Sequence, residues 1–434
     1  MRTSFLALAT LLQLTGTLAF PWMAAPGAEQ ATHDYLKQRG LLEDRGLLDT
    51  LGDLVNGLSG ALATGVKESD RRPDADHPFQ APGPTDQRGP CPGLNTLANH
   101  GYISRTGIVT GSEVIKGTSE GFNMAADLSG VLVLIAVAFG GNLATSTFSI
   151  GGEDERTYSE SGLGSKALGR QFGLDGHSRC EGDASATRAD FFLNGGDNHN
   201  GQPDRFRRFM EHAKANGGEF NVQAANDLYA ENADLSLKNN PRLYFQAYTV
   251  VVILGEYPFI PNFFTNGTYG NGGVSNLESI SSLMGYKIND DGSICYVPER
   301  FPDNWYRRAT PYGVANGLIP GLPTTLAANP KLLPNPLSAI FASGEINQIG
   351  CAIYQGLQSG IPASVLGSTY KGVSNLITDL QHKLLPGLPN LLGCDLDDWS
   401  LQTNSTGGGQ YTDDSMQATG SGGEQSYNAI CDAA

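Results

Sequence analysis

Cys91 is the residue whose surroundings favour chemistry most clearly, because a proline stands directly on each side of it. Pro90 fixes the backbone before the thiol, and Pro92 suits the first turn of a helix, where a missing amide costs little. The thiol is therefore predicted at a helix N-terminus, where the helix dipole and free amides favour the thiolate. A thiolate in this position is suited to bind an iron ion axially, and its electron donation promotes O–O cleavage.

Two other roles for Cys91 stay open on these grounds, namely an inert buried thiol and a protease-type nucleophile with His100 as its base. His100 lies nine residues further along the same predicted helix, roughly 13 Å away at 1.5 Å per residue. That distance is beyond hydrogen-bonding reach, which weakens the nucleophile interpretation.

A second group of candidate ligands consists of Glu181, Gly182 and Ser185. The carboxylate, the Gly182 carbonyl and the hydroxyl offer three hard oxygen atoms within five residues. Such a set suits a small divalent cation that keeps some of its waters. The alternative is a capped helix start, with acidic residues near the positive end of the dipole.

Glu256 follows the apolar stretch 249–254, which suggests a desolvated carboxyl group. Burial among apolar side chains raises the pKa of a carboxyl group, which is useful for a residue that moves protons. The alternative is a solvated carboxylate at the end of an apolar helix. Phe259, three residues further on, is expected to touch substrate.

Composition and charge limit the classes of function. The chain has 434 residues, of which 40% are hydrophobic and 17% are charged, with 56 glycines. This composition allows a substantial core and resembles that of an extracellular enzyme more than that of a cytosolic helical bundle. The net charge of −16 argues against nucleic acid as a partner, because a polyanion would be repelled.

Residues 1–19 are predicted to be a signal peptide, with Arg2 before an apolar run and small residues near position 19. No membrane span is expected, because this run and the apolar stretch 131–139 are too short. Acceptor sequences at Asn266 and Asn404 fit a secreted glycoprotein. The six cysteines are too sparse for a disulfide scaffold. His177 and Cys180 offer too few ligands for a metal site and are expected to be structural.

Three regions are predicted after the signal peptide. Residues 20–88 are interpreted as an N-terminal extension or propeptide, with a surface helix packed on the domain as the alternative for the amphipathic stretch 47–58. Residues 89–394 are predicted to form a mainly α domain, and residues 395–434 a disordered tail. Helices are expected at 94–100, 122–139, 186–192, 204–215, 222–231 and 241–256.

The thirteen residues from Pro90 to Tyr102 resemble the proximal motif of the fungal haem-thiolate peroxidase family, which includes chloroperoxidases and unspecific peroxygenases. The match contains the run Leu-Asn-x-Leu-Ala-Asn-His-Gly-Tyr. The resemblance implies a mainly α, chloroperoxidase-like haem-peroxidase domain with haem b as cofactor. It also implies that Cys91 is the axial ligand of the haem iron.

The segment from Glu181 to Ser185 is similar to the family's magnesium motif, in which the ion lies beside a haem propionate. The resemblance therefore implies that Glu181, Gly182 and Ser185 hold Mg²⁺. Gly182 stands where chloroperoxidases proper have His, so the chain resembles the longer peroxygenase branch. Residues 149–152, Ser-Ile-Gly-Gly, resemble a short signature of the same branch.

Glu256, followed by Phe259, resembles the family's catalytic Glu and its pocket Phe. That carboxyl moves a proton from one peroxide oxygen to the other, so that water can leave. Longer peroxygenases also have an Arg about two helical turns earlier, in a phrase like the one that contains Arg242. Arg242 lies fourteen residues before Glu256, however, roughly 21 Å along an unbroken helix. Either the helix is interrupted, or Glu256 works without the arginine, or the equivalent position is Thr249 or Val250 and the group is lost.

The resemblance implies a peroxidase or peroxygenase that uses hydrogen peroxide to oxidise or halogenate an apolar or aromatic small molecule. Kinship with fungal members implies a tailoring step in secondary-metabolite, for example mycotoxin, biosynthesis. The alternative is a secreted haem-binding protein of the same fold with impaired or no catalysis, which the displaced Arg242 motivates. A C-terminal disulfide between Cys351 and Cys394 is a further feature that the family implies.

Overall fold

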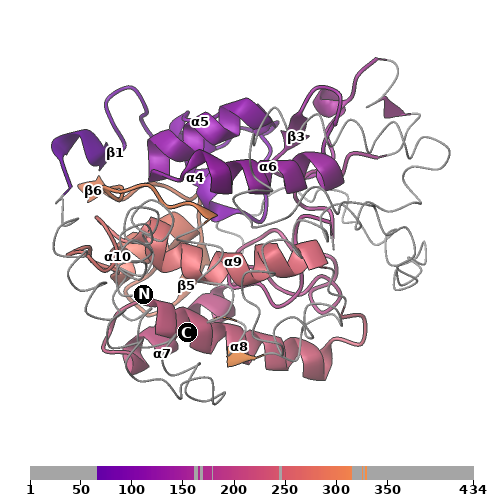
Figure 1. Cartoon of the computed structure of the whole chain (residues 1–434). Helices are drawn as coiled ribbons and strands as arrows, with labels where there is room; N and C mark the ends of the chain where they lie inside the picture. The colour runs from indigo at the N-terminus through magenta and orange to yellow at the C-terminus, as the bar shows by residue number, and fades with distance from the viewer. Residues whose placement is uncertain are drawn as a thin grey trace, which may run out of the picture.

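Three helices from the first part of the described chain form one layer: α4 (Pro92–His100), α5 (Gly111–Phe122) and α6 (Ala126–Gly140). The facing layer contains α7 (Pro203–Ala215), α8 (Val222–Asn239) and α9 (Ala247–Phe264), with α10 (Leu277–Met284) at one end (Figure 1). α8 packs between α7 and α9, and α5 packs on α6. This computed structural model describes residues 66–160, 165–166, 170–177, 179–243, 247–314, 325 and 328–329.

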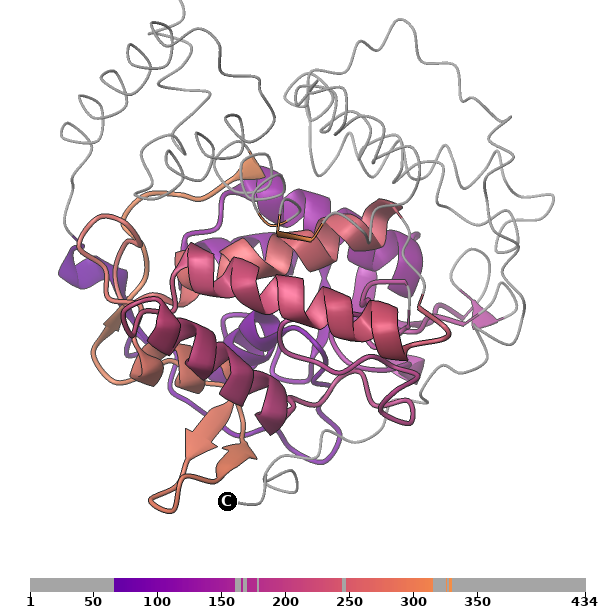
Figure 2. The same ribbon diagram turned by 90° about the horizontal axis from the view of Figure 1, so that it is seen from below.

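The strands of the described residues are short and form three antiparallel pairs at the edges of the helical layers. The pairs are β1 (Arg71–Arg72) with β6 (Trp305–Tyr306), β2 (Ile108–Thr110) with β3 (Thr147–Ser149), and β4 (Tyr286–Ile288) with β5 (Ile294–Tyr296). The β4–β5 hairpin projects from the helices (Figure 2). Two 3₁₀ turns, η2 (Glu68–Asp70) and η3 (Glu155–Thr157), complete these elements. The prediction of a mainly α fold is confirmed.

Local capping explains several helix ends. α4 begins with Pro92 in its first turn and ends at Gly101, whose φ of 76° is left-handed. Thr110 and Glu113 form a capping box that starts α5. Asn123 then takes a φ of 55° and ends the helix, so the predicted helix 122–139 begins only at Ala126, as α6. The predicted single helix was therefore wrong at its start, and α5 was not predicted.

The predicted helix 186–192 is absent, because the backbone amides around it donate to buried carboxylates rather than to earlier carbonyls. The Ala184 amide donates to Asp190 at 3.1 Å, and the Phe191 amide donates to Asp183 at 3.2 Å. Asp183 and Asp190 thus hold a folded loop.

α8 continues to Asn239, beyond its predicted end, and α9 begins and ends later than the predicted helix 241–256. α9 passes through Pro258 and Pro261, neither of which can donate a backbone hydrogen bond. The side chains of Asn262 and Thr265 donate to the carbonyls of Pro258 and Pro261 at 2.9 and 2.5 Å. Burial of the apolar face sustains the helix across the two prolines.

The described part of the predicted N-terminal extension contacts the helices. The Gln80 amide donates to the Asn99 carbonyl at 2.8 Å, and Arg72 donates to the Glu120 carbonyl at 2.7 Å. Asp70 also pairs with Arg307 at 3.3 Å. These contacts place residues 67–88 against the domain, and the division of the chain at residue 88 stays a prediction. The amphipathic stretch 47–58 lies outside the described residues.

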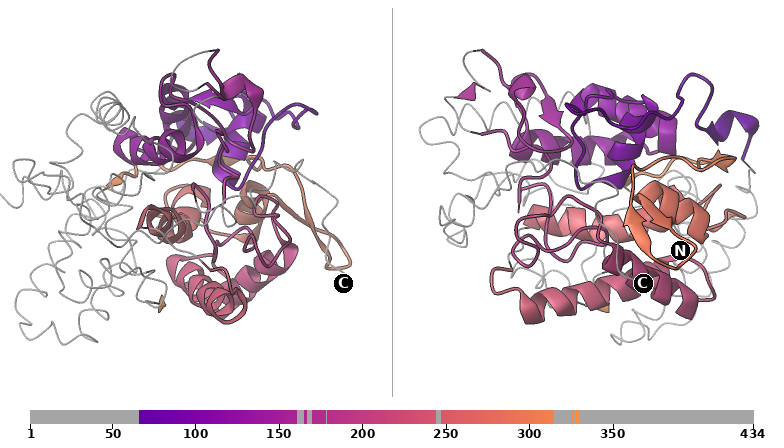
Figure 3. Two further views of the ribbon diagram at one scale, coloured as in Figure 1. Left: turned by 90° about the vertical axis from the view of Figure 1, so that its right-hand side faces the viewer. Right: turned by 180° about the vertical axis from the view of Figure 1, so that it is seen from behind.

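Among the described helices, we find none with the length and apolar character that crossing a bilayer requires. The side and rear views show the two helical layers one above the other (Figure 3). The core between and within them contains fully buried side chains such as Leu97, Leu128, Leu228 and Tyr257. The space left between the layers forms the candidate site.

Candidate active site

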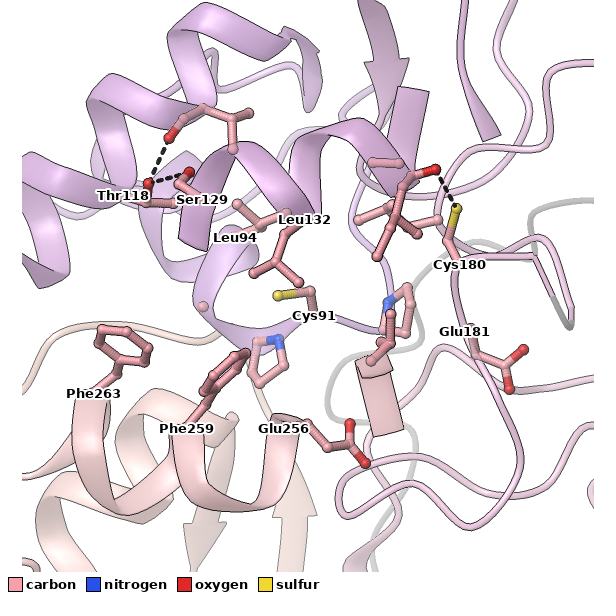
Figure 4. Close-up of a pocket in the computed structure, with 18 of the residues that line it drawn as sticks. Cys91, Leu94, Thr118, Ser129, Leu132, Cys180, Glu181, Glu256, Phe259 and Phe263 are labelled. Carbon is pink, nitrogen blue, oxygen red and sulfur yellow. Dashed lines mark hydrogen bonds between the residues drawn. The ribbon is translucent and has the colours of Figure 1, made fainter. Parts of the chain in front are cut away.

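A mostly apolar cavity lies between the two layers and has about 1290 Å³ of empty space, part of it open to solvent. We call its side formed by α4, α5 and α6 the α4 wall, and its side formed by α9 the α9 wall (Figure 4). A cavity with apolar walls and a few converging polar groups is typical of a cofactor or substrate site. The lining residues with a polar group or a thiol are Cys91, Thr118, Ser129, Cys180, Glu181, Ser185, Thr187 and Glu256.

Cys91 lies in the α4 wall, at the N-cap of α4 and facing α9 (Figure 4). The helix-start position that the prolines predicted is confirmed. Burial raises the pKa of the Cys91 thiol, and the amides of Leu94 and Gly93 act in the opposite direction. The amides at the helix start therefore favour the thiolate, as predicted, but burial outweighs them in the polypeptide alone. A bound metal deprotonates a coordinating thiol outright, which would outweigh this cost.

Cys180 is the second thiol at the cavity, but it already makes a hydrogen bond within the protein. Its thiol donates to the Ile135 carbonyl at 3.9 Å (Figure 4). Burial raises its pKa to about 12. Of the two, Cys91 is thus the thiol suited to bind a metal, and Cys180 is structural.

His100 cannot serve Cys91 as a base. Its Nε2 accepts from the Phe301 amide at 3.1 Å, and its Nδ1 donates to the His77 carbonyl at 2.9 Å. Burial lowers its pKa to about 4, which keeps the ring neutral. The nucleophile interpretation of Cys91 is therefore excluded.

Glu256, Phe259 and Phe263 lie on one face of α9 and form the α9 wall opposite Cys91 (Figure 4). Their spacing of three and four residues puts them on the same side of a helix. The exposed part of Glu256 faces the cavity, and desolvation by the surrounding protein raises its pKa to about 7. The expectation of a desolvated carboxyl group beside an apolar stretch is confirmed. Phe259 lines the cavity where substrate contact was predicted.

Glu256 also touches the predicted magnesium segment, which the sequence did not indicate. Its carboxylate accepts from the Ser185 hydroxyl at 3.2 Å and from the Ala186 amide at 2.5 Å. The acid–base candidate and one candidate metal ligand are therefore neighbours at one end of the cavity.

Arg242 does not belong to this site, so its assignment as a candidate catalytic residue is wrong. It is exposed in the turn after α8, with its guanidinium 5.2 Å from the ring centre of Phe192. The helix is interrupted there, because α8 ends at Asn239 and α9 begins at Ala247. Glu256 is consequently placed without help from Arg242.

Glu181, Gly182 and Ser185 all line the cavity, as a shared metal site requires. Glu181 is 4% exposed, and its Oε1 is buried without a hydrogen-bond partner, which fits a bound cation. Its Oε2 accepts from Asn198 at 2.7 Å. Oxygen donors of this kind suit Mg²⁺.

His177 lies beside Glu181, with Nδ1 3.0 Å from Oε2, and stacks on Phe191 at 4.4 Å. Burial would lower its pKa, but the Glu181 carboxylate raises it, with a net upward shift. His177, Glu181 and Asp183 bring possible ligand atoms within 4.8 Å of one another. His177 was predicted to be structural, and its stacked position beside the Glu181 carboxylate fits that role.

The loop before Cys91 runs against another backbone segment. A Cβ atom at Gly89 would overlap the carbonyl oxygen of Ile150 and would lie 2.7 Å from the Asp175 carboxylate. Ile150 belongs to the Ser-Ile-Gly-Gly segment, which therefore supports the loop that carries the thiol. Only glycine fits such a close backbone approach.

Comparison with known proteins agrees with this geometry. The family model for peroxidase, family 2, matches residues 77–310. The chain belongs to this family. This membership identifies it as a peroxidase with a chloroperoxidase-like domain, and it implies haem as cofactor and hydrogen peroxide as oxidant.

Relatives in the peroxidase family carry related names. An aromatic peroxygenase of Coprinellus radians is 38% identical over 221 residues, which are 50% of this chain and 82% of that protein. The dothistromin biosynthesis peroxidase dotB of Dothistroma septosporum is 29% identical over 355 residues, 74% of this chain and 82% of its own. A chloroperoxidase of Leptoxyphium fumago is 56% identical over only 39 residues, 9% of this chain and 10% of that protein.

Several sequence predictions for this family 2 peroxidase lie outside the described residues: the signal peptide, the tail, Asn404, and the Cys351–Cys394 pair. Cys295 is disulfide-bonded. The side chain of Asn266 is used within the fold, because it accepts from the Tyr306 amide at 2.9 Å and donates to the Asn304 carbonyl at 3.2 Å. Glycosylation and secretion stay predictions.

Proposed function

We propose that this peroxidase binds haem in the cavity through the Cys91 sulfur and uses Glu256 as its acid–base residue. The observation that carries the proposal is their position, a thiol on the α4 wall and a carboxyl group with a pKa of about 7 on the α9 wall of one apolar cavity. The lining fits a large, flat and mostly apolar cofactor, since few of its groups would lose water on contact. When bound, haem supplies the redox chemistry that couples peroxide reduction to substrate oxidation.

The part of Glu256 in this chemistry follows from its pKa. A group that ionises near pH 7 can take a proton from one peroxide oxygen and return it to the other, which lets water leave. The apolar residues around it keep competing water away. Ser185 and the Ala186 amide orient the carboxylate, because each hydrogen bonds to one of its oxygens.

We propose that Glu181, Gly182 and Ser185 hold Mg²⁺, which fits the unpartnered Oε1 of Glu181. A ligand that binds only the folded state at about 100 times its Kd stabilises it by about 2.7 kcal/mol. Addition of magnesium to chelator-treated protein is expected to raise Tm, and Glu181→Gln is expected to abolish this rise. An equal rise in the variant would exclude this site.

Aromatic molecules are the proposed substrate class, because Phe259 and Phe263 on the α9 wall offer ring faces for contact. A tailoring reaction in secondary metabolism is the proposed setting, supported by the relative named for dothistromin biosynthesis. Action outside the cell is proposed from the predicted signal peptide. Turnover of a panel of polycyclic and simple phenols, with Phe259→Ala as the comparison, tests the substrate class.

The decisive experiment is the absorption spectrum of the reduced, carbon-monoxide-bound protein, recorded for the wild type and for Cys91→His. A strongly red-shifted Soret band that disappears in the variant is expected. A wild-type protein without porphyrin, or a variant with an unchanged band, would remove Cys91 as the ligand. Cys180→Ser is the matched control and is expected to keep the band.

A further inference from the structure

A buried ion pair lies behind the α4 wall. Nη2 of Arg188 is 3.2 Å from Oε1 of Glu299, and both side chains are fully buried. The same Glu299 oxygen accepts from Asn95 at 2.9 Å and from the Tyr296 hydroxyl at 2.7 Å. The side chains of Asn95, Arg188 and Tyr296 thus converge on one carboxylate oxygen.

Two of these side chains, Arg188 and Asn95, also hydrogen bond to the backbone of Gly89, two residues before Cys91. Arg188 Nη2 donates to the Gly89 carbonyl at 3.4 Å, and Asn95 Nδ2 donates to it at 2.9 Å. Asn95 Oδ1 accepts from the Gly89 amide at 3.0 Å. Both polar groups of Gly89 are therefore fixed from inside the protein, and the turn that carries the thiol cannot shift without breaking these bonds.

The positive charge of Arg188 influences the pKa of a group on each wall of the cavity. Burial raises the pKa of Cys91 and of Glu256, and the Arg188 guanidinium acts against burial at both residues. Glu299 offsets this positive charge, so that the pair together is neutral. A charge this close to the two candidate groups, in a medium of low dielectric constant, has a large influence on them.

Stability alone does not account for such a pair. A buried ion pair often contributes little net stability, because removing two charges from water costs about as much as their attraction returns. An apolar pair of similar volume would fill the same space. The bonds to Gly89 indicate a more specific role.

We infer that Arg188 and Glu299 are positioning residues for the iron-binding thiol: they lock the Gly89–Cys91 turn and set the charge balance around it. This inference rests on the proposed role of Cys91. Neither residue lines the cavity, so both act through the backbone of Gly89 and through their field.

The test uses two variants that change the charge in opposite directions. The midpoint potential of the haem iron is measured in the haem-loaded protein. Glu299→Gln keeps an acceptor oxygen for Asn95 and Tyr296 but leaves Arg188 uncompensated, so the midpoint is expected to rise, because positive charge favours the reduced iron. Arg188→Met leaves Glu299 uncompensated, so the midpoint is expected to fall. Arg188→Met is also expected to lower the fraction of thiolate-type Soret band and to release haem faster.

Arg307→Met is the matched control, since Arg307 also makes an ion pair and donates to two carbonyls, of Ser119 and Glu120. It is expected to lower Tm without moving the midpoint. The double variant Arg188→Met/Glu299→Met removes both charges, and we expect a midpoint near that of the wild type with a weaker thiolate band. This variant keeps the test open if Arg188→Met does not fold.

Midpoints that do not move, or that move in the same direction in Arg188→Met and Glu299→Gln, would overturn the inference. A full thiolate-type band in both Arg188→Met and the double variant would also overturn the positioning role. Failure of the proposed function looks different, because the wild type itself would then lack a thiolate-type band that depends on Cys91.

Discussion

In the α4 wall, helix α4 itself is anchored by side-chain hydrogen bonds, whereas most of the buried side chains of α9 are apolar. On α4, Asn95 donates to the Glu299 carboxylate at 2.9 Å, and Asn99 donates to the backbone carbonyl of Glu299 at 2.8 Å. His100 accepts from the Phe301 amide at 3.1 Å. On α9, Ile253, Leu254 and Ile260 are buried among apolar neighbours. Hydrogen bonds fix direction as well as distance, but apolar contact is nondirectional.

This difference matches what each wall must do. A metal ligand has to stay in one place, since small displacements of a reacting group cost much activity. A wall that meets substrate can change shape by exchanging apolar side chains of similar volume at small cost. We therefore expect polar substitutions to be damaging on the α4 wall and apolar ones to be tolerated on the α9 wall, with Glu256 as the exception.

Glu256→Gln is expected to have the largest effect, because it removes the proposed proton-transfer group while keeping the size of the side chain. General acid–base catalysis contributes about 10²–10⁴-fold, so kcat/KM for peroxide should fall by that factor. The absorption spectrum should keep its thiolate-type band. The exposed Glu211→Gln on α7 is the control. Unchanged turnover in Glu256→Gln would mean that the α9 wall is apolar lining only.

The pH dependence of the wild type should report the same carboxyl group. The base form of Glu256 takes the peroxide proton, and this form is lost as the pH falls below a pKa of about 7. We expect kcat/KM to decrease roughly tenfold per pH unit below that value and to level off above it. A stopped-flow pH series tests this, and the decline should be missing in Glu256→Gln. A flat wild-type profile from pH 5 to 8 would contradict the assignment.

Asn95→Ala tests the α4 wall through stability. It leaves the Gly89 amide without this buried partner and removes one of the hydrogen bonds to the Glu299 carboxylate, which should cost about 1–3 kcal/mol of unfolding free energy. Denaturant titration of the haem-loaded protein measures this loss. Asn239→Ala, at an exposed site, should change stability by less than about 0.5 kcal/mol. Equal effects of the two variants would show that the α4 wall does not depend on its hydrogen bonds.

Ile260→Val should have the smallest effect, because it removes one methylene group from the packed α9 wall. A loss of about 1 kcal/mol and a nearly unchanged kcat are expected. The same titration and a steady-state assay measure both quantities. A loss as large as that of Asn95→Ala would show that the two walls are equally constrained and would end the distinction between them.

The start of α4 could be predicted from the sequence in detail, because the residues that define it are adjacent in the chain. Pro90, Cys91 and Pro92 define the helix start, and the motif that follows carries the polar side chains that anchor it. The partner, Glu299, lies about two hundred residues further on, and nothing local to it marks a buried carboxylate. Arg188 lies three residues after the recognised magnesium segment and had no predicted role, since its side chain bonds to residues about a hundred positions away.

The α9 wall was predicted only in part. Its apolar composition indicated a buried helix and a desolvated Glu256, and both are observed. Its bounds were predicted wrongly, because Pro258 and Pro261 normally argue against a helix and only the buried environment overrides them. Arg242 was misassigned because similarity of a phrase does not fix its distance from Glu256. The thiol of Cys91 was expected to ionise readily. The sequence shows that Cys91 starts a helix but does not show that its sulfur is buried, and this burial raises its pKa.

The glycine at position 89 makes the position of Cys91, the proposed iron ligand, adjustable by volume alone. Its α-carbon abuts the Ile150 carbonyl, so even one added methyl group has to push two stretches of main chain apart. A Gly89→Ala protein would thus displace the sulfur while every charge and polar partner stays in the sequence. Such a variant would change the position of the sulfur, and with it the electronic properties of the iron that it is proposed to bind, without any change in charge.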